Sequence, residues 1–155
     1  MDNLFMARAI ELSLDNVLSG RGGPFGAVVV KGGAIVAEGT NQVTSINDPT
    51  AHAEVLAIRE ACRKLGAFDL EGCEIYTSCE PCPMCLGAIY WARISRIYFG
   101  NADADASRIG FDDSLIYREL AQPHAQRKIP MIQMMRDEAL VAFRAWERKP
   151  NKIEY

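Results

Sequence analysis

Two short motifs that lie far apart in the chain can act together only in a fold that brings two helix starts to one point. The first is His52-Ala53-Glu54, within the stretch PTAHAEVLAI, and the second is Pro81-Cys82-Pro83-Met84-Cys85. Each lies at the start of a segment with a helical pattern. Because Cys82 and Cys85 are one helical turn apart, their thiols can converge, and the positive end of the helix dipole favours the thiolate form.

A metal site is the interpretation that uses both motifs. A C-x-x-C pair alone also fits a redox dithiol. His52 supplies a third ligand, and two thiolates with one imidazole leave a tetrahedral zinc an open position, as in catalytic sites. Cys79 could complete a closed structural site instead, and the sequence leaves that alternative open.

Glu54 can stand beside the ion and transfer protons between water and substrate. H-x-E with P-C-x-x-C is the pattern of zinc deaminases, so one Zn²⁺ per chain is expected.

The rest of the pattern predicts an α/β protein. Apolar residues recur at helical spacing over 2–18, and the apolar runs 25–30 and 34–40 flank a Lys-Gly-Gly turn, which predicts a hairpin. Further helices are expected at 52–65, 81–90, 114–120 and 137–148, a helix or loop at 102–111, and strands at 73–78, 95–100 and 129–134. Strands joined through a helix should run parallel. This order indicates a three-layer α/β/α sandwich with a central mixed five-stranded sheet.

Length and charge limit the classes of function. A chain of 155 residues fits a single domain over 1–155, in which 150–155 forms a separate C-terminal segment. The net charge of −3, without a cluster of Lys and Arg, argues against a nucleic-acid partner. No apolar run reaches the ~20 residues of a membrane helix. The N-terminus carries acids early, unlike a targeting peptide. A cytoplasmic protein is expected, with cysteines used for metal or catalysis rather than disulfides.

Longer stretches carry a family resemblance. The stretches GGPFGAVVVK, NDPTAHAEV, YTSCEPCPMCLGAIYWAR and GFDDS, with the ending Glu-Tyr, resemble the cytidine and deoxycytidylate deaminase superfamily, and within it the bacterial guanine deaminases. The resemblance covers nearly the whole chain. It implies the cytidine deaminase-like fold and hydrolysis of guanine to xanthine and ammonia in purine metabolism. It also implies zinc bound by His52, Cys82 and Cys85, with Glu54 as the proton shuttle.

The same resemblance suggests residues of a purine pocket. Phe25 resembles the stacking aromatic of the family, although a core residue of the hairpin is the alternative. Asn41 resembles the residue that pairs with the purine edge, and an amide both donates and accepts hydrogen bonds. Asp113, chosen over Asp112, resembles the acid that contacts guanine N–H groups and so rejects adenine. The two acids could instead cap the helix that begins at Ser114.

Three more residues complete the expected pocket. The backbone N–H of Ala53, at a helix start, could donate to the substrate. Trp91 belongs to the part of the motif that narrows the substrate, with core packing as the alternative. Tyr155 ends the segment 150–155, which is expected to cover the site, exclude water and close off the side where ribose would hang. It could act on its own site. Because it follows Pro150, it could instead reach the site of a neighbouring subunit, so a homodimer with exchanged segments is expected. A frayed end is the alternative.

Other functions stay open on the sequence. Guanosine or another small nucleobase or nucleoside could be the substrate, because the choice depends on room for ribose. Enzymes that deaminate adenosine in tRNA share the zinc motif, but they need basic surface that this acidic chain does not show. A non-catalytic zinc module, completed by Cys79, would have no use for Glu54.

Overall fold

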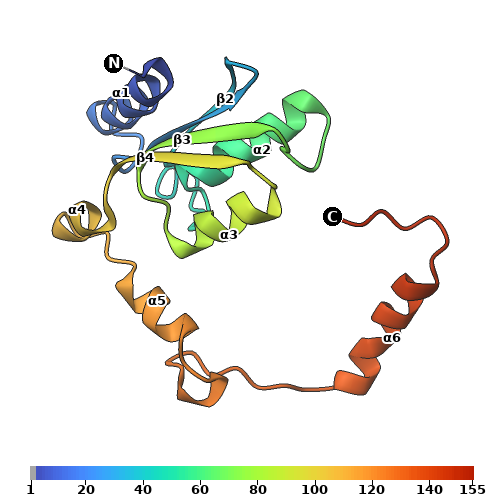
Figure 1. Ribbon diagram of the computed structural model, residues 1–155. Coiled ribbons are helices and arrows are strands. Elements are labelled where there is room, and N and C mark those ends of the chain that lie inside the picture. The colour runs from blue at the N-terminus through green and yellow to red at the C-terminus, as the bar shows by residue number, and fades with distance from the viewer. Residues whose placement is uncertain (1–2) are drawn as a thin grey trace. The chain divides into compact units, whose positions relative to one another are not determined.

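The computed structural model describes residues 3–155, and they form two compact units. The first unit ends at Asp113, and the second is Ser114–Tyr155. The elements are shown in Figure 1, and their bounds are α1 (Leu4–Leu18), β1 (Gly26–Lys31), β2 (Ala34–Thr40), α2 (Ala53–Leu65), β3 (Cys73–Cys79), α3 (Pro83–Trp91), β4 (Arg96–Asn101), α4 (Asp103–Arg108), α5 (Ser114–Leu120), the 3-10 helix η1 (His124–Gln126) and α6 (Arg136–Arg148).

The sheet is mixed, as predicted, and its strand order is β2-β1-β3-β4. Strand β1 pairs antiparallel with both β2 and β3, and the hairpin turns at Gly32 and Gly33, both of which have positive φ angles. Strands β3 and β4 are parallel, with α3 as the connection between them. A parallel pair requires such a crossover, which explains why the helix that follows the metal motif lies between these two strands in sequence.

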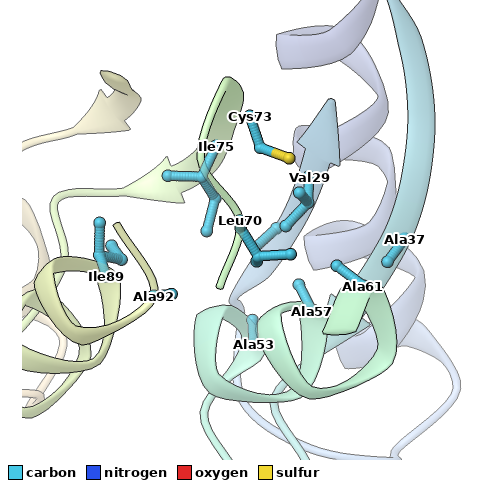
Figure 2. Close-up of a cluster of buried hydrophobic side chains, with 11 residues drawn as sticks. Val29, Ala37, Ala53, Ala57, Ala61, Leu70, Cys73, Ile75, Ile89 and Ala92 are labelled. Carbon is cyan, nitrogen blue, oxygen red and sulfur yellow. The ribbon is translucent and has the colours of Figure 1, made fainter. Parts of the chain in front are cut away.

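Alternate residues of the strands face two separate cores. Ala27 and Val29 of β1 pack with α2 and α3 on one face of the sheet (Figure 2), whereas Val28 and Val30 pack with Ala9 of α1 on the other. This alternation follows from the two-residue period of a strand, and it requires apolar side chains on both faces. Helices therefore cover both faces of the sheet, which confirms the α/β class and the three layers within the first unit.

Helix α2 lies directly against β2 at Gly39. A Cβ atom at Gly39 would lie 2.1 Å from the carbonyl oxygen of Ala53 and 2.7 Å from the nitrogen of Ala57. Only glycine permits so close an approach of the two backbones. Ala53, Ala57 and Ala61 are fully buried along the same side of α2. Small residues at this interface thus determine where the first turn of α2, with its motif residues, lies over the sheet.

The prediction of a fifth strand was wrong, because the sheet has four strands. Residues 129–134, where the strand was expected, have no regular secondary structure, and Ile129 and Ile132 are exposed. Their β-prone composition forms a strand only beside a partner strand. The second unit, which the structure describes completely, contains helices and no strand. The short 3-10 helix at His124 was not predicted, whereas 102–111 resolves as helix α4 followed by a loop.

No residue of Ser114–Tyr155, described throughout, is buried within the single chain. The exposed apolar side chains include Met131, Val141, Phe143 and Trp146. Helix α6 is nevertheless amphipathic, so it carries a face suited to burial. Among residues 3–155, no helix has the length and hydropathy needed to cross a membrane.

Candidate metal centre

The three predicted metal ligands meet where α2 and α3 begin. His52 occupies the N-cap position of α2 and Cys82 that of α3, in each case without a capping hydrogen bond from the side chain, and Pro83 follows at the first position of α3. Proline suits that position because its fixed φ angle is helical and no N–H is needed there. Cys85 lies in the first turn of α3 and is fully buried. The ligands thus occupy positions fixed by two rigid helix starts, and the local sequence sets both starts.

The spacing of the donor atoms fits tetrahedral zinc. His52 Nδ1 lies 3.5 Å from Cys82 Sγ and 3.4 Å from Cys85 Sγ. Zinc–nitrogen and zinc–sulfur bonds at a tetrahedral angle separate the two donors by about 3.6 Å. All three donor atoms lie within 4.8 Å of one another, and they form a possible metal-binding group among the described residues. The residues present therefore fit one zinc ion with a position left for a further ligand.

The surroundings of the two cysteine ligands shift their pKa values in opposite directions. Hydrogen bonds with the Cys85 thiol and with His52 lower the pKa of Cys82 to about 4, against the effect of burial. The same Cys82–Cys85 hydrogen bond, together with burial, raises the pKa of Cys85 far above its usual range. Because zinc binds thiolates, metal binding at this centre must release the remaining thiol proton.

Glu54 stands beside the ligands without joining them. Its Oε2 atom lies 3.4 Å from Cys85 Sγ, and the residue is 8% exposed. Burial raises the pKa of this carboxyl group. A carboxyl with a raised pKa is a better proton acceptor than an ordinary one, and its place beside the ligand Cys85 suits general acid–base catalysis at a bound metal.

Cys79 is not brought into the ligand set. Its Sγ atom lies 3.9 Å from the carbonyl oxygen of Ala102, to which the thiol donates. Burial raises the pKa of Cys79 to about 11. Its Sγ atom is also not part of the group of donor atoms within 4.8 Å of one another that His52, Cys82 and Cys85 form. The structure therefore favours the three-ligand arrangement over a closed four-ligand site.

Phe25 and Asn41 lie together in the structure. The backbone N–H of Asn41 donates to the carbonyl oxygen of Phe25 at 3.1 Å, and Asn41 is 7% exposed. The ring of Phe25 meets the edge of Phe111 at a centroid distance of 4.9 Å and an angle of 89°. Sequence reasoning missed Phe111. Its position next to the acids of the stretch GFDD was the available signal.

Asp113 is a partly buried acid with an unpartnered side-chain oxygen. Its Oδ1 atom is covered and has no hydrogen-bond partner among the described residues. Burial, and then a hydrogen bond with the Asp103 carboxyl group, raise the pKa of Asp113 to about 6; the charge of Cys82 also contributes. Asp103 was not predicted. Its backbone N–H donates to Glu80 Oε2 at 3.1 Å, which holds Asp103 near the loop between β3 and α3.

The remaining predicted residues lie in different surroundings. Ala53 is buried as the first residue of α2, so its N–H lies outside the hydrogen-bond ladder of the helix. Trp91 is the last residue of α3, about 13 Å along the helix from its start. It is 70% exposed and lines a shallow surface hollow with Gly87, Tyr90 and Arg93. Tyr155 belongs to the second unit, so its role in the site stays a prediction.

Comparisons with known proteins agree with this centre. The family model for the cytidine and deoxycytidylate deaminase zinc-binding region matches residues 1–101. The guanine deaminase of Bacillus subtilis is 56% identical over 151 residues, which is 97% of each chain. A crystal structure of guanine deaminase from Bacillus subtilis superposes with a TM-score of 0.96 at 55% identity, covering 100% of this chain and 99% of that one.

A second group of relatives matches a shorter region. The tRNA-specific adenosine deaminase of Aquifex aeolicus is 50% identical over 80 residues, which is 52% of this chain and 53% of its own. The matching family model describes a zinc-binding region, and the donor atoms of His52, Cys82 and Cys85 are spaced to hold such an ion. The chain therefore belongs to the cytidine and deoxycytidylate deaminase family of zinc-dependent enzymes.

Proposed function

We propose that this protein is a zinc-dependent aminohydrolase that converts guanine and water to xanthine and ammonia. The observation that carries the proposal is the buried Glu54 carboxyl group, 3.4 Å from Cys85 Sγ, beside three metal ligands that leave a position open. A structural zinc site has no use for such an acid. The choice of guanine rests on the 56% identity to a guanine deaminase over 97% of the chain.

Glu54 handles the protons of the reaction. Bound zinc lowers the pKa of water and so supplies a nucleophile at neutral pH. Glu54 takes a proton from the attacking water and gives it to the ring nitrogen next to C2. It then carries the second proton to the amino group, which leaves C2 as ammonia while the C2 carbonyl of xanthine forms. One carboxyl group that serves both transfers must stay within hydrogen-bond reach of water and ring, which its place in the first turn of α2 allows.

Phe25, Asn41 and Asp113 are the proposed contacts to the purine. The Oδ1 atom of Asn41 accepts the Val43 N–H at 3.3 Å. The Nδ2 group of Asn41, which is the donor of this side chain, takes no part in that bond. That donor can therefore face the purine edge. Asp113, with its unpartnered Oδ1, suits the N–H groups of guanine, because a partly buried acceptor without a partner favours a ligand that donates. Adenine lacks that donor pattern.

Two alternative substrates, adenosine in tRNA and guanosine, can be weighed against guanine. The match to the tRNA-specific adenosine deaminase covers 52% of this chain, whereas the match to the guanine deaminase covers 97%. The net charge of −3 also gives little attraction for RNA. Guanosine stays the nearest alternative, since exclusion of ribose would depend on the segment 150–155.

Ammonia release from a substrate panel tests the function. Purified protein with one zinc per chain is mixed with guanine, guanosine, cytosine, adenine, adenosine and a tRNA. Release from guanine, at a kcat/KM at least tenfold above every other substrate, is expected. Faster release from guanosine would replace the proposed substrate, and release from none would reject the enzymatic function. Asp113→Asn should damage guanine turnover without removing zinc, and unchanged kinetics would remove Asp113 from the pocket.

We also propose that the protein is a homodimer in which the C-terminal segments are exchanged. The support is the second unit, in which no residue is buried in a single chain although α6 is amphipathic and Phe143 and Trp146 are exposed. Contact with a second copy would bury this surface, and Tyr155 would then lie over the neighbour's site. The free thiols of the metal centre suit a reducing compartment, which supports a cytoplasmic location.

Subunit mixing tests the exchange. A protein that lacks residues 151–155 should keep its fold and its zinc but lose most guanine turnover. Mixed with a Glu54→Ala protein and allowed to exchange subunits, it should regain part of the activity, because one site then has an intact Glu54 and a tail from the other chain. Full activity of the truncated protein alone would exclude a covering role, and mixtures that stay inactive would place the tail on its own site.

A further inference from the structure

Asn16 is a polar residue in an apolar place. It lies near the end of α1, on the side that faces the sheet, and it is fully buried, as is Ala9 two turns earlier. Its Nδ2 atom donates to the carbonyl oxygens of Gly23 and Asn41, both at 2.8 Å. Its Oδ1 atom is buried without a hydrogen-bond partner among the described residues. An unpartnered buried oxygen destabilises the fold, so the donor half of the amide is the part that this position uses.

The two carbonyl groups belong to the two loops that carry Phe25 and Asn41. Gly23 precedes β1, and its carbonyl oxygen also accepts the N–H of Phe25 at 2.9 Å. Asn41 follows β2, and its N–H donates to the carbonyl oxygen of Phe25 at 3.1 Å. The Asn16 side chain of α1 therefore bonds to both loops. The backbone hydrogen bond between Asn41 and Phe25 joins the same two loops directly to each other.

The loops are also in direct backbone contact at Gly22. A Cβ atom there would lie 2.1 Å from the carbonyl oxygen of Asn41 and 3.0 Å from Asn16 Nδ2. The glycine thus makes room for the bond between Asn16 and Asn41. Gly22 and the buried amide of Asn16 therefore both lie against the carbonyl oxygen of Asn41. Asn41 is the residue proposed to pair with the purine edge.

We propose that Asn16 is a positioning residue for purine recognition. By holding the carbonyl oxygens of Gly23 and Asn41 on one amide group, it sets the separation between the ring of Phe25 and the side chain of Asn41. The inference rests on the proposed function, since it requires that these two residues contact the purine. Asn16 hydrogen-bonds neither a metal ligand nor Glu54, so its effect belongs to substrate binding rather than to metal content or proton transfer.

The test replaces the amide with an apolar group of similar size. Asn16→Leu removes the two donated bonds and the unpartnered oxygen together. The Gly23 carbonyl oxygen keeps the Phe25 N–H, whereas the Asn41 carbonyl oxygen loses the Asn16 donor, so the fold should survive with reduced stability. Misplacement of substrate contacts by about 1 Å can cost about 10²-fold in kcat/KM. Because Asn16 hydrogen-bonds neither a metal ligand nor Glu54, we expect this loss to appear in KM. We expect KM for guanine, and the Kd of the analogue 8-azaguanine measured by calorimetry in a Glu54→Ala background, to rise at least about tenfold. Zinc content should stay at one per chain, and kcat should stay within about threefold.

A control on the same helix separates positioning from general packing. The Ser13 hydroxyl donates to the carbonyl oxygen of Ile10 within its own helix, so Ser13→Ala should leave KM and Kd unchanged. If the Leu variant does not fold, Asn16→Ala, which introduces no new bulk, must show the same rise in KM and Kd. Wild-type KM and Kd in the folded variant would overturn the inference, as would a loss confined to kcat or zinc. A wild-type protein inactive on guanine would instead overturn the proposed function.

Discussion

The contact between Gly39 and the first turn of α2 offers a quantitative test of how the fold positions the metal centre. In Gly39→Ala the new Cβ atom would lie 2.1 Å from the Ala53 carbonyl oxygen, whereas real contacts of this kind do not fall below 3.0 Å. The helix start must therefore move by about 1 Å, because close-packed interiors transmit such strain instead of absorbing it. His52 and Glu54 lie on that first turn and move with it.

The expected losses follow from this displacement. Overpacking of a core typically costs about 1–3 kcal/mol, which for a protein of this size lowers Tm by roughly 2–12 °C. A shift of about 1 Å in the catalytic groups lowers kcat/KM by roughly 10²-fold. Thermal unfolding followed by circular dichroism and ammonia release from guanine measure the two losses on one preparation, and elemental analysis measures its zinc content.

A second glycine provides the matched control. A Cβ atom at Gly87, inside α3, would meet nothing within 4 Å, so Gly87→Ala should keep full activity. It should also gain up to about 1 kcal/mol, since alanine favours the helix over glycine. If Gly39→Ala keeps the wild-type Tm and kcat/KM, the backbone contact between β2 and α2 does not position the metal centre.

Three further predictions concern the metal centre and the surface. Glu54→Ala should keep one zinc per chain and lose about 10²–10⁴-fold in guanine turnover, and near-normal turnover would refute the proton shuttle. Cys82→Ser should lose zinc by elemental analysis while Cys79→Ser keeps it; the reverse result would change the ligand set. A salt bridge with Arg8 lowers the pKa of Glu38, so its stabilising effect is complete above pH about 4.5 and is lost as the pH falls through the lowered pKa. Denaturant unfolding should therefore show Arg8→Met to be less stable than wild type at pH 7, with a smaller difference near pH 3, and a pH-independent difference would contradict this.

The features that sequence could predict are those with a local cause. The helices at 4–18 and 53–65 and the hairpin between 26 and 40 follow from hydrophobic period and from Gly-Gly at the turn. The convergence of His52 with the C-x-x-C pair followed from motif spacing and helix starts. The helix and hairpin signals lie within a few residues of the structures that they specify, whereas the convergence of His52 with Cys82 and Cys85 was inferred from the zinc pattern that the two distant motifs form together.

The features that sequence could not predict depend on contacts between distant segments. Residues 129–134 have a strand pattern, but a strand forms only with a partner, and no pattern within the segment reports whether one exists. In the sequence, Asn16 looks like an ordinary polar residue of an amphipathic helix. Its hydrogen bond to the Asn41 carbonyl oxygen depends on how the loops fold. The Asp103–Asp113 contact likewise arises from the path of the chain after β4.

The lack of buried residues in Ser114–Tyr155 has a consequence for the lifetime of the protein. Chain segments with few buried contacts open readily, and proteases cleave them first. A lone subunit would then be trimmed towards Asp113, and the product would keep all three zinc ligands and Glu54 while losing Tyr155. The proposed dimer would protect the same peptide bonds. If that dimer forms, the concentration of the protein would decide how long each copy persists intact, and degradation would selectively remove the copies that had failed to find a partner.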